Sequence, residues 1–385
     1  MRRIYADHNA TTPLHPRVFE AMLPYLREHF GNASSVHIFG REARAAIDDA
    51  RVRMAKLLGT QESEIVFTGG GTEADNTAIF GVVRAQADKG RHVVTSSIEH
   101  HAVLHACQYL ERRGECEVTW LPVSQDCLVD PTDLRKAIRN DTVLVSIMSA
   151  NNETGTVQPV RALAAVCRGR GVPFHTDAVQ SYAKVPVNVN DWGVDLLSIA
   201  AHKFYGPKGV GVLYVRRGTK FDPLLFGGSH ENERRAGTEN VAGIVGMAKA
   251  AELAMAKMSE EQSRLFGLTE RLAAGITGQI GGAHRNGHFK LRIGNTVNFS
   301  FEGCEEEGLL LGLDLEGVAV SSGSACAVGS LEPSHVLKAM GVPHELARAA
   351  VRFSLGTDNK TEDVDLILQA TARVVERLRS FAAKA

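Results

Sequence analysis

The chain has 385 residues, 43 of them basic and 44 acidic, and its six cysteines form no CxxC pair. Its length exceeds that of a single core, so we expect two domains. The balanced charge argues against nucleic acid or a membrane surface as a partner, and the cysteine spacing argues against a zinc site or a disulfide framework. No apolar run reaches the roughly 18 residues of a membrane span, so we expect a soluble, cytoplasmic protein.

Short apolar runs of strand character alternate with helical patterns through the first two thirds of the chain. The strands that we expect cover residues 64–67, 92–95, 143–148, 172–175, 195–199 and 210–215. Because strands that are separated by helices pair in parallel, the pattern predicts an α/β fold whose mostly parallel sheet is covered on both faces. Ligands bind such sheets at the carboxyl ends of the strands.

The pattern changes after about residue 255, where a long charged helix begins. The elements expected after it are a strand at 296–300, helices near 305 and 332, a strand at 351–354 and a terminal helix from 362. This order predicts a smaller α+β domain. We therefore divide the chain into a large domain of residues 14–255 and a small domain of residues 1–13 and 256–385.

A glycine-rich turn, GGGTE at residues 69–73, follows the first strand of the large domain and opens a helix. Glycine lets the backbone approach a phosphate, and the first amides of a helix point outward at its positive end. Thr72 adds a hydroxyl at the cap. The turn matches neither a P-loop nor GxGxxG, so it favours a cup for a single phosphate. An ordinary capped turn is the alternative.

Two polar residues, Asp177 and Gln180, follow the strand at 172–175 and are expected at the end of that strand. A buried carboxylate needs a cationic partner. A protonated pyridine ring would serve, and this pairing keeps an electron-sink cofactor electron-poor. An aspartate that caps a helix is the alternative.

Lys203 follows a nearly continuous apolar strand. Burial would lower the pKa of its amine and leave it available for a covalent bond to a carbonyl cofactor. Lys208 competes for this role, and a solvated turn lysine is a further alternative. The order along the chain favours Lys203, because the phosphate cup, Asp177 and Lys203 each follow a strand of their own.

Two adjacent histidines, His100 and His101, follow the strand at 92–95. Imidazole stacks flat on an aromatic ring and exchanges protons near neutral pH. We expect one of the pair to cover a cofactor, and a purely structural histidine is the alternative.

Cys326 closes the stretch SSGSAC, in which every preceding residue is small. A cysteine that fills a core normally lies in an apolar periodic run, so this thiol is interpreted as presented rather than packed. The other five cysteines are expected to be mostly buried and inert. A thiol in a loop without catalytic role is the alternative for Cys326.

Seven separated motifs together resemble those of the cysteine desulfurases, and the resemblance covers essentially the whole chain. The motifs are DHNATTP at 7–13, FGNASS at 30–35, EHH at 99–101, NNETG at 151–155, HTDAVQ at 175–180, HK at 202–203 and SSGSAC at 321–326. These are fold-type I enzymes of the class V aminotransferase superfamily that depend on pyridoxal phosphate (PLP). RAGTEN at 235–240 and RFSLGTD at 352–358 favour the NifS branch of the NifS/IscS-like family. The resemblance implies a seven-stranded sheet in the large domain.

The resemblance also implies a role for each matching residue. Lys203 would hold PLP covalently, Asp177 would pair with the pyridine nitrogen, and Gln180 would form a hydrogen bond with the ring oxygen. His100 would stack on the ring and act in acid–base catalysis. The phosphate would be held by Gly71, Thr72 and His202, and the substrate carboxylate would be bound by Asn152 and Arg352. Thr238 would reach the phosphate of the other subunit's cofactor, so the protein is expected to be a homodimer. No metal is expected in the PLP site, although Cys326 would contact a nascent cluster transiently.

The implied activity is removal of sulfur from L-cysteine. Lys203 would move the α-proton, and the Cys326 thiolate would attack the substrate sulfur, leaving L-alanine and a persulfide for an acceptor such as an iron–sulfur scaffold. Ala200 stands where many relatives carry a serine that donates to the phosphate, which predicts weaker PLP retention. The alternatives are a selenocysteine lyase, a catalytically idle assembly subunit and a generic aminotransferase, the last of which leaves the placed thiol unexplained.

Overall fold

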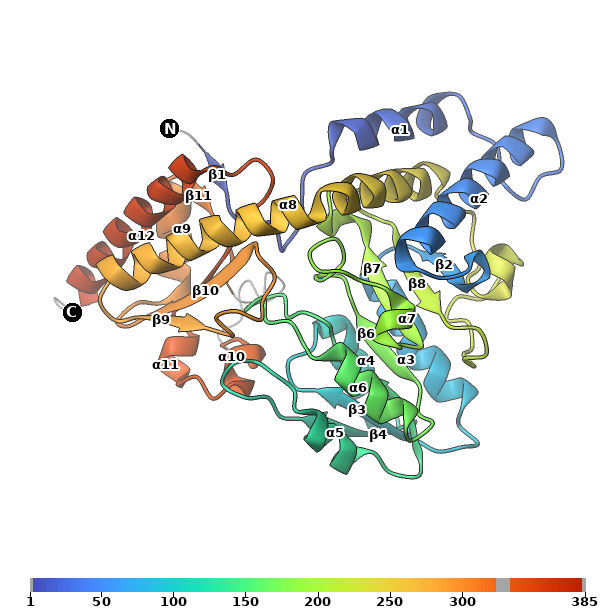
Figure 1. Cartoon of the computed structure of the whole chain (residues 1–385), viewed down its shortest axis with the longest axis horizontal. Coiled ribbons are helices and arrows are strands. Elements are labelled where there is room, and N and C mark those ends of the chain that lie inside the picture. Colours follow the sequence, from blue (N-terminus) through green and yellow to red (C-terminus); the bar gives the residue numbers. More distant parts are fainter. Residues whose placement is uncertain (1–2, 323–332, 383–385) are drawn as a thin grey trace.

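The computed structural model of the protein describes residues 3–322 and 333–382. Figure 1 shows a larger and a smaller lobe, which one long helix, α8 (Val241–Gln279), connects. Both chain ends lie at the smaller lobe. In the described part of the chain, no helix is at once long and apolar enough to cross a membrane.

The larger lobe contains a seven-stranded sheet with the strand order β2-β8-β7-β6-β5-β3-β4. Its strands are β2 (Ile65–Thr68), β3 (His92–Ser96), β4 (Glu117–Leu121), β5 (Thr142–Ser146), β6 (Phe174–Asp177), β7 (Leu196–Ala200) and β8 (Gly211–Val215). The five strands β7, β6, β5, β3 and β4 run parallel to one another, whereas β8 is antiparallel to both β7 and β2. The expected α/β fold with a mostly parallel sheet is confirmed.

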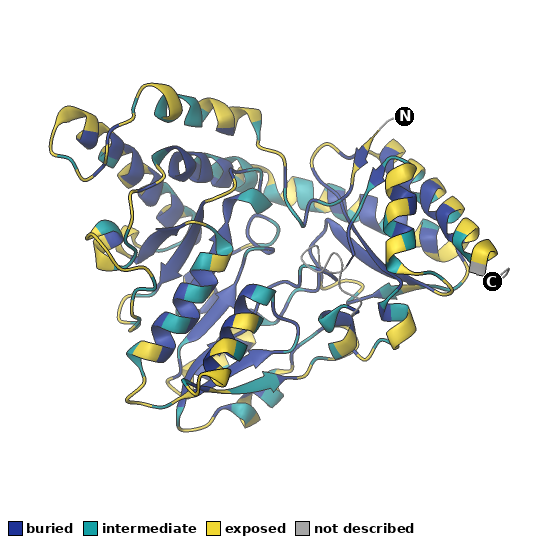
Figure 2. Ribbon diagram, turned by 180° about the vertical axis from the view of Figure 1, so that it is seen from behind, coloured by how far each residue is buried: buried dark blue, intermediate teal, exposed yellow. Residues whose placement is uncertain are grey.

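Helices cover both faces of this sheet, because neighbouring strand residues enter different apolar clusters. Leu196 packs with the cluster under α3 and α4, while Leu197 packs with the cluster under α2, α6 and the first part of α8. The helices and 3-10 turns of the lobe are α1 (Pro16–Arg27), α2 (Ile38–Leu58), η1 (Glu62–Glu64), α3 (Gly71–Ala85), α4 (His101–Arg112), α5 (Pro131–Ala137), α6 (Val160–Arg168), α7 (Val189–Trp192), η2 (Ala201–Lys203) and η3 (His230–Glu233). This double cover explains the apolar strand sequences, and Figure 2 shows most strands of the sheet as buried.

One strand of the sheet, β4, was not located from the sequence. It is an edge strand that begins at an exposed glutamate and has mostly half-buried side chains. An edge strand with one neighbour needs no continuous apolar run, so its sequence carries a weak signal.

The smaller lobe has a three-stranded antiparallel sheet in the order β12-β10-β9, and a parallel pair in which the N-terminal β1 joins β11. Its elements are β1 (Ile4–Tyr5), β9 (Ala283–Asn286), β10 (Thr296–Phe301), α9 (Glu306–Leu315), β11 (Val318–Ala319), α10 (His335–Ala339), α11 (His344–Ala347), β12 (Ala350–Ser354) and α12 (Thr361–Ala382). Most of these elements share an apolar cluster separate from those of the larger lobe, whereas α10 and α11 pack in a cluster that also contains Ile98, Cys127 and Met148.

Helix α8 belongs to both lobes. Its buried residues fall into two groups, from 242 to 251 and from 265 to 276, and the first group packs in the larger lobe and the second in the smaller. The helix continues through residue 255 without a break. We therefore keep the division at residue 255 as a proposal.

Candidate active site

Several predicted site residues meet at one edge of the large sheet. Asp177 is the last residue of β6, Lys203 ends η2 directly after β7, and the glycine-rich turn follows β2. These three strands run in the same direction, because β8 is antiparallel to both β2 and β7 and β6 is parallel to β7. Their carboxyl ends therefore lie at the same edge, where open α/β sheets bind ligands.

The glycine-rich turn forms a hollow at the start of α3. Residues 69–73 line it together with Thr11 and His202. Gly70 has a φ of 148°, in the region that favours glycine. A Cβ on Gly71 would lie only 2.7 Å from Cγ2 of Val179, so glycine allows the start of α3 to approach the turn that follows Asp177. The positive end of α3 thus faces a hollow suited to a phosphate.

Asp177 presents a buried carboxylate beside this hollow. Burial raises the pKa of Asp177 to about 6, against the opposing effects of a hydrogen bond from the Val179 N–H and the charge of Lys203. Behind it, burial and the charge of Asp177 raise the pKa of Asp75 well above its usual value. Of the two carboxyl groups, Asp75 is therefore the one that favours its protonated form, and Asp177 is the one that can pair with a cation.

The amine of Lys203 points at the N-terminal segment. Its Nζ donates to the main-chain oxygens of Asn9 at 2.6 Å and Ala10 at 2.8 Å. Gln180 reaches the same place, because its Nε2 donates to the Asn9 oxygen at 2.8 Å. The N-terminal segment, which pairs with the smaller lobe, thus connects two predicted cofactor residues.

Both predicted site histidines are neutral in this environment. Burial and the nearby charge of Lys203 lower the pKa of His100 to about 4, and the same two causes, in the same order, lower the pKa of His202 to about 4. His100 caps α4 by accepting from the Ala102 N–H at 3.2 Å, and Nδ1 of His202 lies 3.2 Å from the Thr11 hydroxyl. An uncharged imidazole is suited to stacking on an electron-poor ring.

The two predicted substrate residues come from different lobes, Asn152 from the segment after β5 and Arg352 from β12. Arg352, on β12, donates from Nη2 to Oδ1 of Asp7 at 2.7 Å and from Nη1 to the main-chain oxygen of Asn152 at 3.0 Å. Asn152 therefore meets Arg352 through its backbone. The side chain of Arg352 is almost fully buried, with 2 % of its surface exposed, which indicates a fixed orientation.

Two predicted site residues are not part of this group. Thr238 is exposed in the segment before α8, although the ion pair between Arg235 and Glu73 at 2.8 Å ties that segment to the glycine-rich turn. Cys326 lies outside the described residues. Among the described residues, no group of three or more His, Cys, Asp and Glu side chains is arranged to hold a metal ion.

Three residues that contact this site were not assigned a role from the sequence. Asp7 pairs with Arg352, Asn9 receives Lys203 and Gln180, and Lys184 donates to Gln180 at 2.9 Å. Asp7 and Asn9 lie in the motif DHNATTP, so the motif itself was the signal. Lys184 stands four residues after Gln180 and had no signal beyond that spacing.

The chain matches known proteins over nearly its whole length. The family model Aminotransferase class-V matches residues 4–367. A protein named Cysteine desulfurase IscS from Dictyoglomus turgidum is 53% identical over 99% of this chain and 96% of its own. A solved NifS-like protein has a TM-score of 0.91 at 38% identity over 98% of this chain and 100% of its own, and the structure described as SspA in complex with cysteine has 0.81 at 37% over 91% and 98%.

These relatives carry both family names, so the preference for the NifS branch stays a prediction, whereas the wider resemblance is confirmed. The chain belongs to the IscS/NifS-like cysteine desulfurases of the aminotransferase class-V family.

Proposed function

We propose that this protein is a PLP-dependent cysteine desulfurase that converts L-cysteine to L-alanine and leaves the sulfur as a persulfide on Cys326. The observation that carries the proposal is the meeting of the Lys203 amine, the Asp177 carboxylate and the glycine-lined hollow at one sheet edge. A relative named cysteine desulfurase and a related structure with bound cysteine support the substrate.

The residues present fit PLP. The hollow at Gly71 and Thr72, with His202 beside it, suits the phosphate, and the buried Asp177 suits a protonated ring nitrogen. Gln180 offers an amide to the ring oxygen. When bound, PLP withdraws electrons from the α-carbon of the substrate, a chemistry that no side chain supplies.

The chain's own residues would divide the remaining tasks. Lys203 moves the α-proton, while the neutral His100 covers the ring and serves as an acid–base group. Arg352 and Asn152 hold the substrate carboxylate and so fix which bond faces the cofactor.

Cys326 would then take the sulfur. Its thiolate forms an S–S bond as the Cβ–S bond of the substrate breaks, and the electron pair left on carbon takes up protons to give alanine. The described cysteines are poor candidates for this step. Burial raises the pKa of Cys116, Cys127 and Cys167 to about 12, and also raises the pKa of the half-buried Cys304.

We further propose that the protein acts as a homodimer in the cytoplasm and passes its sulfur to an acceptor such as an iron–sulfur scaffold. Large apolar side chains are exposed around α1, the α1–α2 connection and the segment of Thr238, which supports a second copy as their cover. Those with most exposure are Phe30 at 78%, Val36 at 88% and Phe226 at 81%. Light scattering of the wild type checks the dimer.

Mass spectrometry of the PLP-loaded protein after incubation with L-cysteine tests the function. We expect one added sulfur on Cys326 and alanine in solution. The control variant Cys304→Ser should give both products as the wild type does. Cys326→Ser should carry no added sulfur. Alanine production without sulfur on Cys326 would contradict the proposed nucleophile, a colourless protein after PLP treatment would contradict the cofactor, and much faster turnover of selenocysteine would indicate the lyase.

A further inference from the structure

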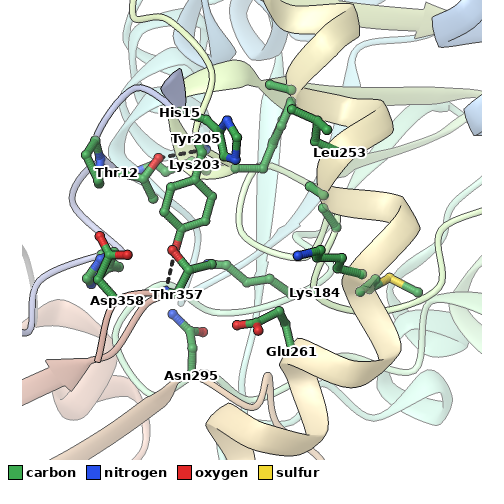
Figure 3. Close-up of a pocket in the computed structure, with 18 of the residues that line it drawn as sticks. Thr12, His15, Lys184, Lys203, Tyr205, Leu253, Glu261, Asn295, Thr357 and Asp358 are labelled. Carbon is green, nitrogen blue, oxygen red and sulfur yellow. Dashed lines mark hydrogen bonds between the residues drawn. The ribbon is translucent and has the colours of Figure 1, made fainter. Parts of the chain in front are cut away.

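Lys184 lies between the proposed cofactor site and a cavity of about 590 Å³ at the junction of the two lobes. Figure 3 shows this cavity, with Lys184, Lys203 and Tyr205 among its lining residues. The Nζ atom of Lys184 donates to Oε1 of Gln180 at 2.9 Å and to Oδ1 of Asn9 at 3.2 Å. The amine thus contacts two residues that in turn contact each other.

Both acceptors are side-chain amides, whose orientation a lysine can decide. An amide can rotate to exchange its oxygen and its NH2 group, but a lysine amine that donates to both amides selects their oxygens. With Oε1 of Gln180 held in this way, its Nε2 donates to the Asn9 main-chain oxygen at 2.8 Å and keeps a second N–H. Gln180 therefore presents a donor, not an acceptor, to any further partner.

Asn9 is fixed by the same amine. Its Oδ1 accepts from Lys184 and from Nδ2 of Asn295 at 3.1 Å, while its Nδ2 donates to the Thr296 hydroxyl at 2.8 Å. Its main-chain oxygen is the atom that receives Lys203 at 2.6 Å. Displacement of Asn9 would therefore move the acceptor of the Lys203 amine.

Charge pairing does not explain Lys184. Within residues 3–322 and 333–382, it forms no ion pair with a carboxylate, and its contacts are to the neutral amides of Gln180 and Asn9. Burial, with the charges of Lys203 and Arg352, holds the pKa of Lys184 well below its usual value. A neutral amine has two N–H groups, which match the two amide oxygens.

We propose that Lys184 is a positioning residue that turns the Gln180 amide so that its nitrogen is available to the ring oxygen of the cofactor, and that fixes the Asn9 carbonyl against Lys203. The inference rests on the PLP-dependent function proposed above. It assigns Lys184 no contact with substrate or cofactor.

A pH titration of the visible absorbance of the PLP-loaded protein tests the inference. A donor to the ring oxygen stabilises negative charge there, so it lowers the midpoint of the absorbance change. In Lys184→Met the Gln180 amide can rotate away, and we expect the midpoint to rise by about 0.5 to 1 pH unit, the shift that one hydrogen bond produces. Lys257→Met removes an exposed amine from the same cavity and should keep the wild-type midpoint.

A double variant separates positioning from a direct effect. If Lys184 acts through Gln180, then Lys184→Met should add nothing to the midpoint shift of Gln180→Leu. Independent addition of the two shifts, or an unchanged midpoint in Lys184→Met, would overturn the proposal. A merely structural role would lower the unfolding temperature of the PLP-free protein and leave the midpoint unchanged.

Two further results keep this test distinct from that of the function. If Lys184→Met does not fold, Lys184→Arg, which keeps hydrogen-bond donors, takes its place. Its midpoint should lie nearer to that of the wild type than the midpoint of Gln180→Leu does. A midpoint equal to that of Gln180→Leu would overturn the inference. Failure of the wild type to take up PLP would contradict the proposed function and with it this inference.

Discussion

The cofactor half and the substrate half of the site hold their charges in opposite ways. The cofactor half, which comprises Lys203, Asp177 and the glycine-lined hollow, has a buried carboxylate that forms no ion pair among the described residues, and burial raises its pKa to about 6. In the substrate half, the Arg352 guanidinium already lies 2.7 Å from the Asp7 carboxylate. In the cofactor half, a ligand would bring the cation that pairs with Asp177. In the substrate half, the charge of Arg352 is already paired with Asp7 without a ligand.

This difference predicts which step each half controls. A charged ligand that enters the cofactor half supplies a partner that buried groups lack, so changes there should affect cofactor binding and chemistry. A carboxylate that enters the substrate half must share or exchange Arg352 with Asp7, so the net gain is smaller. Variants of the substrate half should therefore act mainly on KM.

The largest effect is expected from Lys203→Ala. This amine is the one that we propose to hold the cofactor covalently and to move the α-proton, so alanine formation should fall by about 10³-fold or more. Lys208→Ala, which removes the exposed lysine five residues later, should stay within about tenfold of the wild type. Equal losses in the two variants would leave the cofactor half without its predicted centre.

Arg352→Met should lower kcat/KM for cysteine by about 10²-fold, mostly through KM. The change removes charge-assisted hydrogen bonds to the substrate carboxylate, each worth about 1.5 to 3 kcal/mol. Steady-state assays over a wide range of cysteine concentrations separate KM from kcat.

The matched variant Asp7→Asn removes the carboxylate that competes for Arg352 while it keeps an oxygen that can accept a hydrogen bond. Its KM for cysteine should be equal to or below that of the wild type. A rise in KM as large as that of Arg352→Met would mean that Asp7 positions the guanidinium, and the contrast between the two halves would then fail.

The pH dependence of PLP binding tests the carboxylate of the cofactor half. Without PLP, Asp177 binds a proton below a pKa of about 6, and only its ionised form can pair with a protonated ring nitrogen. Affinity contributed by this pair should therefore rise with pH, by about tenfold between pH 5 and 7, and level off above. PLP titrations at several pH values should give a flatter profile for Asp177→Asn. An identical slope in the variant would assign the dependence to another group.

The cofactor half could be predicted from the sequence because each of its residues ends or follows a strand. The three strands were located from the sequence, and their common direction in the sheet brings their carboxyl ends together. The substrate half could not be derived in this way. Arg352 was assigned only through the resemblance to a family, and its partner Asp7 stands 345 positions away in the sequence. That contact depends on the return of the N-terminal segment to the smaller lobe, which no local pattern specifies.

The smallest expected effect concerns the wall of the phosphate hollow. Ala200 is buried at the end of β7, and its Cβ would lie 3.5 Å from a Cβ on Gly71, so its side chain lies beside a residue of the hollow. In Ala200→Ser a hydroxyl there could donate to the phosphate, and loss of PLP should slow by about 3- to 10-fold, the net worth of one hydrogen bond.

The control variant Ala201→Ser places the same hydroxyl in an apolar cluster of the larger lobe. It should lower the unfolding temperature without slowing PLP loss. The hollow already offers the helix amides and the Thr72 hydroxyl to a phosphate. Slower PLP loss in Ala200→Ser alone would therefore show that the phosphate can accept one more hydrogen bond than these groups donate. PLP loss from Ala200→Ser that is as fast as from the wild type would instead show that these groups saturate the phosphate.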